Sequence, residues 1–96
     1  MITESKTDDR LFFPATQRNR DPIINVLSKI IPKRGLVLEI ASGSGEHGVI
    51  FQERFQNIIW QTSDPDPICR KSIRAWIKHK SLSKKMPDPI DLDVKN

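Results

Sequence analysis

The chain has 96 residues, 36% of them hydrophobic, and its 16 basic and 12 acidic side chains give a formal net charge of +4. This length and composition predict one globular domain with a modest core, and the chain lacks the roughly 20-residue apolar run that spans a bilayer. The polar, acidic amino terminus excludes a secretory signal peptide and the single cysteine excludes an internal disulfide, so we expect a cytoplasmic protein with no membrane partner.

Residues 1–20 are polar and carry no sustained hydrophobic period, which predicts an irregular amino-terminal arm. Its apolar cluster, LFF at 11–13, is expected to pack onto the chain's own core. The first helix is predicted to open at Asp21-Pro22, because Asp is a favoured N-cap and Pro suits the first helical position. Pro32 ends this helix, whose apolar face comprises Ile23, Leu27, Ile30 and Ile31.

Strands and helices then alternate along the chain. Two short apolar runs rich in β-branched residues predict strands over 36–40 and 58–62. A loop of small residues, 41–45, follows the first strand and leads into a predicted helix over 46–55. These segments form the strand–loop–helix–strand sequence of a parallel βαβ unit.

A second pair of capping residues opens the third predicted helix. Asp66 is its candidate N-cap and Pro67 its first residue, and its apolar period extends to about Lys80. Residues 90–94 are the predicted third strand. The basic run over 78–85 contains no Phe, Trp or Tyr, so we expect a solvated helix end there and no nucleic-acid partner.

The predicted order α-β-α-β-α-β indicates an α/β fold with a parallel, doubly wound sheet and helices on both faces. A complete sheet of this kind has about six strands. We therefore expect the amino-terminal half of a Rossmann-like fold, with 21–96 as a partial cofactor-binding domain after the 1–20 arm. A truncated half-sheet exposes an apolar edge and faces, which favours self-association.

The loop after the first predicted strand contains the pattern G-x-G-x-x-G, formed by Gly43, Gly45 and Gly48. Small residues let a ligand lie against the backbone, and the helix that follows offers unpaired N–H groups. Asp64 lies about 20 residues beyond Gly43, where a carboxylate accepts hydrogen bonds from the ribose hydroxyls of an adenosine. Asp66 is better placed for the helix cap, which leaves Asp64 for the ribose.

Glu39 discriminates between two adenosine cofactors. It lies on an otherwise apolar strand just before the loop, where a buried carboxylate needs donors or a cation. A dinucleotide pyrophosphate is anionic and would be repelled. S-adenosylmethionine carries an ammonium and a sulfonium, so a carboxylate near it is favourable. Gly48 is then predicted to serve helix packing and to make no phosphate contact.

The pattern Glu-x-Ala-x-Gly-x-Gly at 39–45 resembles the E-x-G-x-G-x-G signature of class I S-adenosylmethionine-dependent methyltransferases. More narrowly, the chain resembles the methyltransferase-like protein 26 family, also called domain of unknown function 938. The resemblance is carried by PATQRNRDPI at 14–23, LEIASGSGEHG at 38–48, WQTSDPD at 60–66 and IDLDV at 90–94. These pieces span nearly the whole chain from Pro14 onward.

The resemblance implies S-adenosylmethionine as the cofactor and a role for each matching position. Gly43 and Gly45 would line its methionine end, and Glu39 would orient the methionine ammonium. Asp64 would hold the ribose diol, and Asp93 at the end of the third strand would face the adenine amino group.

The resemblance also implies that Arg18 and Asn19 of the arm lie over the cofactor pocket. Ala41 departs from the signature, which has glycine there, and we expect a small local adjustment at this position. His47 follows the loop, and a polar contact at the helix start is favoured over a contact with substrate or cofactor. No His or Cys spacing matches a metal site, so no metal is expected.

The resulting hypothesis is an S-adenosylmethionine-dependent methyltransferase, or the cofactor-binding amino-terminal part of one. Its methyl acceptor and catalytic residues stay open. The reaction would be direct displacement, in which the acceptor attacks the sulfonium methyl and the enzyme supplies positioning and charge placement. The alternatives are a fragment of an NAD-binding Rossmann oxidoreductase, favoured by the glycine pattern, and a non-catalytic interaction module, favoured by the short chain and basic charge.

Overall fold

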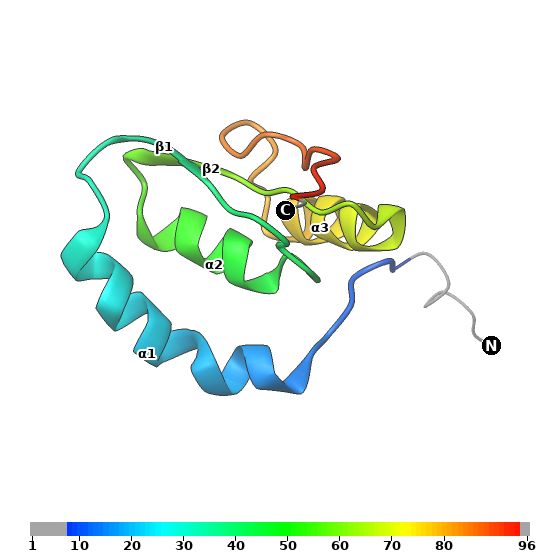
Figure 1. Ribbon diagram of the computed structural model, residues 1–96, viewed down its shortest axis with the longest axis horizontal. Coiled ribbons are helices and arrows are strands. Elements are labelled where there is room, and N and C mark those ends of the chain that lie inside the picture. The colour runs from blue at the N-terminus through cyan, green and yellow to red at the C-terminus, as the bar shows by residue number, and fades with distance from the viewer. Residues whose placement is uncertain (1–7, 95–96) are drawn as a thin grey trace.

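The computed structural model describes residues 8–94, which form three helices and two strands in mixed α/β order (Figure 1). The elements in chain order are α1 (Pro14–Ile30), β1 (Gly35–Leu38), α2 (Glu46–Arg54), β2 (Ile58–Gln61) and α3 (Pro67–His79). No helix in this part of the chain is long and apolar enough to cross a membrane.

Helix α1 begins eight residues earlier than the sequence predicts, since its first residue is Pro14 and Pro22 lies inside the helix. The predicted irregular arm is therefore wrong over 14–20. Pro14 occupies a first-turn position, where a missing N–H costs little. Pro22 removes one internal hydrogen bond, but the carbonyl that loses its partner belongs to Arg18, an exposed residue where water can replace the donor.

The apolar cluster before α1 packs onto the chain's own core, as predicted. The Leu11 N–H donates to Ser72 Oγ at 2.8 Å, and the Trp76 indole N–H donates to the Leu11 carbonyl at 3.0 Å. The Phe12 ring meets the Trp76 ring edge-on, with centroids 5.2 Å apart. These contacts attach Leu11 and Phe12 to α3, although the Phe12 side chain stays 54% exposed.

Strands β1 and β2 pair in parallel, in a register that sets Gly35 opposite Ile58 and Leu38 opposite Gln61. Both strands and the helix between them match the predicted segments to within two residues, and the Asp66 cap of α3 is confirmed by a 2.9 Å hydrogen bond from the Ile68 N–H. The sequence therefore predicts the central βαβ unit and the start of α3 correctly.

The predicted third strand is wrong, because residues 90–94 form a single parallel bridge, Ile90 with Ser63. The bridge consists of hydrogen bonds from Ile90 N–H to Thr62 O at 3.2 Å and from Asp64 N–H to Ile90 O at 3.1 Å. Beyond it, Pro65 has no N–H, and the next backbone N–H donates to the Asp64 side chain. A longer ladder therefore has no donor on the β2 side.

The core lies between the sheet and its helices, with α2 packed on β2 and both α1 and α3 packed on α2. Its buried members are Val49, Phe51, Ile58, Trp60, Ile73, Trp76, Ile77 and Met86. Figure 1 shows α1 and α2 on the same side of the two strands. The second helical layer of a doubly wound sheet is not formed by residues 8–94, so helices on both faces are a wrong expectation for this part of the chain.

Candidate functional site

Hydrogen bonds join the loops that follow β1 and β2. The Ser42 N–H donates to Ser63 O at 2.8 Å, and the Ser63 N–H donates to Ser42 Oγ at 3.0 Å. The Ser63 hydroxyl donates to the Glu39 carbonyl at 2.6 Å, and the Gly43 N–H donates to Asp64 Oδ2 at 3.0 Å. The carboxyl ends of two parallel strands meet at one edge of the sheet, which is where α/β folds bind ligands.

Asp64 is the best-fixed acid of this region. Its side chain is buried, and its carboxylate accepts hydrogen bonds from the Gly43 N–H at 3.0 Å and the Asp66 N–H at 2.9 Å. An ionised carboxylate can accept about four hydrogen bonds, so it retains acceptor capacity for a ligand. The structure thus brings Gly43 and Asp64 into direct contact, although α2 and β2 lie between them in the sequence.

Three residues of the glycine loop have positive φ: Ala41 at 53°, Gly43 at 64° and Gly45 at 92°. Glycine adopts this conformation readily, whereas alanine is strained there. Gly45 is also confined by packing, because a Cβ atom would lie 2.8 Å from the Ile73 Cα of α3. Ala41 adopts a left-handed conformation at the position where the methyltransferase signature has glycine.

Gly48 serves helix packing, as predicted. A Cβ atom at this position would lie 3.0 Å from Thr62 Cγ2 and 3.2 Å from Glu39 Oε1. The absence of a side chain therefore lets α2 approach the ends of both strands closely. The third glycine of G-x-G-x-x-G has a structural role that is independent of any phosphate.

Glu39 directly follows β1 and continues its pairing, because its N–H donates to Gln61 O at 2.8 Å. Its carboxylate lies on the helix side of the sheet and accepts a hydrogen bond from the Trp60 indole N–H at 3.0 Å. Burial raises the pKa of the Glu39 carboxyl above its usual range, against the hydrogen bonds from Trp60 and Ser42. The donor that the sequence analysis required for this acid is therefore Trp60.

Glu46 is a second buried acid at the same loop, and the sequence analysis did not single it out. It is the first residue of α2 and only 3% exposed, and its Oε1 has no hydrogen-bond partner within residues 8–94. A glutamate in the first helical turn is favoured by the helix dipole alone, so its sequence position gives no signal of burial. A buried carboxylate oxygen without a partner is stabilised when a cation or a hydrogen-bond donor binds to it.

His47 makes a polar contact at the start of α2, as favoured from the sequence. Its Nε2 lies 2.8 Å from the Thr16 carbonyl of α1, and its ring stacks on Phe51 at 5.3 Å. In the same region the Phe13 ring lies 3.6 Å from the position that a Cβ of Gly43 would occupy. The start of α1 therefore lies against the glycine loop.

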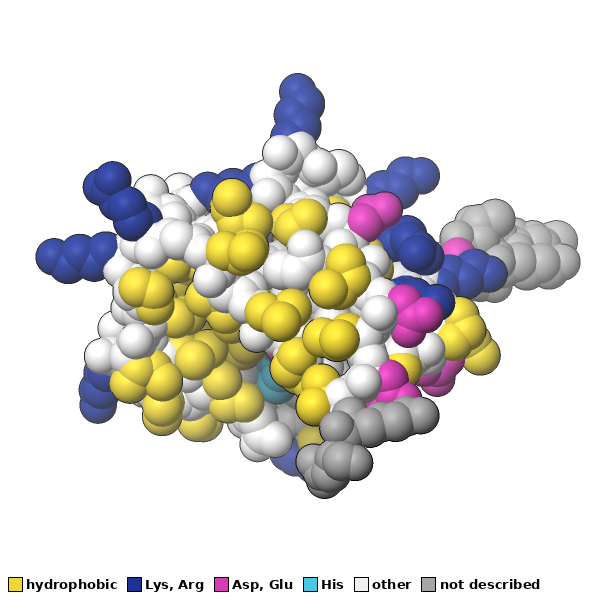
Figure 2. All heavy atoms as spheres, turned by 45° about the horizontal axis from the view of Figure 1, so that its top comes forward, with side chains coloured by type: hydrophobic (Ala, Val, Ile, Leu, Met, Phe, Trp, Pro, Cys, Tyr) yellow, Lys and Arg dark blue, Asp and Glu magenta, His cyan; other side chains and the backbone are white. Residues whose placement is uncertain are grey.

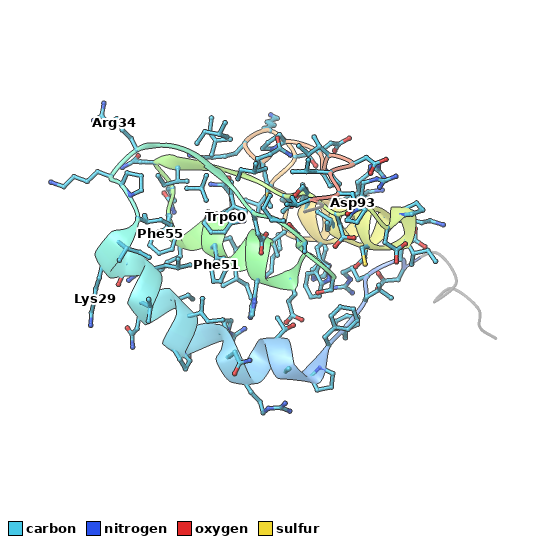
Figure 3. All side chains as sticks on the ribbon, in the orientation of Figure 1. Lys29, Arg34, Phe51, Phe55, Trp60 and Asp93 are labelled. Carbon is cyan, nitrogen blue, oxygen red and sulfur yellow. The ribbon has the colours of Figure 1, made fainter. Side chains whose placement is uncertain are left out.

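The remaining predicted site residues lie on the surface. Arg18 and Asn19 are exposed on α1, and Asp93 is exposed beyond the Ile90 bridge. Figure 3 shows Asp93 above α3, on the other side of Trp60 from Arg34. Their contacts with a cofactor stay predictions.

Two surface cavities lie away from the glycine loop. One of about 260 Å³ is at the opposite end of the sheet, between the α1–β1 and α2–β2 connections, and its lining includes Lys33 and Arg54. The other, of about 340 Å³, is lined by Asp8, Arg10 and three residues of α3. Neither contains a predicted site residue, and residues 8–94 contain no group of three His, Cys, Asp or Glu placed to hold a metal. The candidate site is therefore assigned from the hydrogen bonds between the strand ends, and not from a cavity.

Comparison with known proteins gives one family match. A family model described as a protein of unknown function, DUF938, matches residues 10–96. This range includes every helix and strand of the fold and all residues of the candidate site. No solved structure matches the chain.

Proposed function

Because the chain belongs to the DUF938 family, whose description names no activity, we propose its function from the site: an S-adenosylmethionine-dependent methyltransferase, or the cofactor-binding amino-terminal part of one. In this proposal the βαβ unit is the first half of a Rossmann-like methyltransferase sheet. The cofactor lies across the carboxyl ends of β1 and β2, as ligands do in open α/β sheets.

The observation that carries the proposal is the hydrogen bond from the Gly43 N–H to Asp64 Oδ2, at 3.0 Å. It joins the small-residue loop after β1 to the acid after β2, which are the two parts of an adenosine site that the sequence separates. The second hydrogen bond, from the Asp66 N–H, fixes the orientation of the carboxylate. A carboxylate fixed beside the glycine loop suits the two hydroxyls of a ribose.

The charges around the loop favour S-adenosylmethionine over a dinucleotide. Glu39 precedes the loop and Glu46 follows it, and both carboxylates are largely removed from water. Such groups repel a pyrophosphate and attract the ammonium and sulfonium of S-adenosylmethionine. The partnerless Oε1 of Glu46 adds a second candidate, beside Glu39, for the methionine ammonium.

When bound, S-adenosylmethionine supplies a methyl group activated by its positive sulfur. The chain's own residues hold and orient this cofactor. Asp64 would accept from the ribose, and the two glutamates would place negative charge near the cationic end of the cofactor. These groups act through positioning and charge placement.

Replacement of Asp64 tests the proposal. We expect Asp64→Asn to weaken binding of S-adenosylmethionine and S-adenosylhomocysteine about 10- to 100-fold, because hydrogen bonds to a charged acceptor contribute about 1.5–3 kcal/mol. Isothermal titration calorimetry measures the change. Asp21→Asn removes the same charge from an exposed position on α1 and is the matched control. Equal affinities of the Asp64 variant and the wild-type chain would contradict the proposed ribose contact.

A further inference from the structure

The cavity at the amino end of the strands is lined by hydrogen-bond donors. It has a volume of about 260 Å³ and lies between the α1–β1 and α2–β2 connections. Its polar lining residues are Ser28, Lys33, Arg54, Gln56 and Asn57, and no Asp or Glu of residues 8–94 belongs to the lining. The last four of these side chains are exposed and make no hydrogen bond or ion pair with the described part of the chain. Their donors are therefore available to a ligand.

Two backbone acceptors of the same lining are already occupied. The Gln52 side-chain amide donates to Ile58 O at 2.6 Å and to Phe55 O at 3.4 Å. The Ile58 N–H also donates to Phe55 O, at 3.1 Å. A ligand that accepts hydrogen bonds therefore suits this cavity better than a ligand that donates them.

Positive charge is in excess around the cavity. Helices α1 and α2 both end here, and two helix carboxyl termini together contribute about one negative charge. Lys29 and Arg54, in the last turns of these helices, offset it. The charges of Lys33 and Arg34 then remain uncompensated within residues 8–94. Figure 3 shows Lys29 and Arg34 at the same end of the molecule as Phe55. Figure 2 shows Lys and Arg side chains at this left end and no acidic side chain there in that view.

We propose that this cavity binds the phosphate group of a small phosphorylated molecule. A phosphate monoester carries a charge of about −1.5 to −2 at pH 7, which the two lining cations, Lys33 and Arg54, match. A single carboxylate would leave one of these cations uncompensated. The Arg54 guanidinium also presents paired donors that suit two phosphate oxygens. Glu53, which precedes Arg54 in the sequence, is paired with Lys80 at 3.6 Å.

The rest of the lining suits a small ligand. The remaining residues, Ile31, Pro32, Phe55 and Ile58, are apolar, and the volume lies just below the range of about 300–1,000 Å³ that is usual for ligand pockets. The cavity is at the end of the sheet opposite the glycine loop. A phosphate bound here therefore leaves the strand carboxyl ends free, and the inference does not rest on the proposed function.

Titration of the full chain with sodium phosphate at pH 7, followed by two-dimensional proton–nitrogen NMR, tests the site. Sodium chloride keeps the ionic strength constant, because salt screens exposed charges. We expect saturable shifts of the amide signals of Lys33, Gln56 and Asn57, with a dissociation constant of about 1–10 mM. Sodium acetate is the comparison and should bind more weakly, because it carries one charge. Equal binding of acetate, or no saturable shift of these signals, would overturn the proposal.

Replacement of the lining cations tests the same site without relying on signal positions. Lys33→Gln and Arg54→Gln should each raise the phosphate dissociation constant about threefold to fivefold, as expected for one exposed charge pair. The double variant should raise it at least about tenfold if the two effects add. Lys84→Gln removes the same charge from an exposed turn after α3 and is the matched control for Lys33. Far-UV circular dichroism checks that the variants stay folded. An equal effect of Lys84→Gln, or unchanged phosphate binding by the double variant, would contradict the site.

Discussion

At the scale of single residues, the two acids predicted to serve one cofactor have different surroundings. Asp64 accepts hydrogen bonds from two backbone N–H groups, which fix the orientation of its carboxylate. Glu39 accepts one from the Trp60 indole, and burial raises its pKa. The backbone thus orients Asp64, whereas a cationic ligand beside Glu39 would oppose the rise in pKa that burial causes.

The raised pKa of Glu39 predicts a pH-dependent cost to the folded chain. Above about pH 4 the unfolded chain loses this proton before the folded chain does, so the free energy of unfolding falls as pH rises toward the folded pKa. Glu39→Gln keeps an acceptor for Trp60 and removes the charge. We expect this variant to be more stable than the wild-type chain at pH 7 and no more stable at pH 3.5.

Urea denaturation at the two pH values measures this difference. Glu53→Gln removes a charge from an exposed position of α2 and is the control, although it also breaks a 3.6 Å ion pair with Lys80. A Glu39→Gln variant that is less stable than the wild-type chain at pH 7 would show that the charged form is favoured in the folded state.

The positive φ of Ala41 leads us to expect that a glycine at this position stabilises the folded chain. Its φ of 53° costs an L-residue about 1–2 kcal/mol, and glycine is free of this strain but loses more entropy on folding. We expect Ala41→Gly to raise the free energy of unfolding by up to about 1 kcal/mol. Ala75→Gly, inside α3, should lower it by about 1 kcal/mol. Chemical denaturation compares them, and loss of stability on Ala41→Gly would contradict the strain.

At the scale of elements, the segments 35–61 and the Asp66 cap were predictable because each depends on local pattern and on standard capping. The meeting of Gly43 with Asp64 was predictable too, because parallel strands bring their carboxyl ends together. The start of α1 was not, since Asp21-Pro22 is a good cap signal and the tertiary contact of Thr16 with His47 leaves no local signature. The absence of a third strand over 90–94 was not predictable either. It depends on the Asp64 side chain, which accepts the Asp66 N–H that a longer ladder would need.

Pro22 lies inside α1 and removes one of its backbone hydrogen bonds, so we expect it to destabilise the helix. Pro22→Ala restores a backbone N–H that can donate to the Arg18 carbonyl, and alanine is the best helix former. We expect a gain in stability of about 1–3 kcal/mol, measured by thermal and urea denaturation with far-UV circular dichroism. Pro14→Ala should change stability by less than about 0.5 kcal/mol, because Pro14 lies in the first turn. An equal effect of both substitutions would contradict an internal position for Pro22.

At the scale of the whole molecule, the fold separates two surfaces. The strand ends carry Asp64 and the glycine loop, and the uncovered sheet face carries Leu36, Leu38 and Ile59. The strand pattern predicts an apolar face for each strand, but which side the helices cover is settled only by three-dimensional packing. Glu46 is a similar case, because its burial depends on the assembled helices and not on its place in the sequence.

The central claim is that the strand ends bind S-adenosylmethionine, and equilibrium binding to the wild-type chain tests it most directly. Isothermal titration with S-adenosylmethionine, S-adenosylhomocysteine and NADH compares the two cofactor classes at the same site. We predict binding of both adenosyl sulfur compounds and none of NADH, because Glu39 and Glu46 repel a pyrophosphate. Binding of NADH without S-adenosylmethionine, or no binding of either sulfur compound at millimolar concentration, would contradict the account.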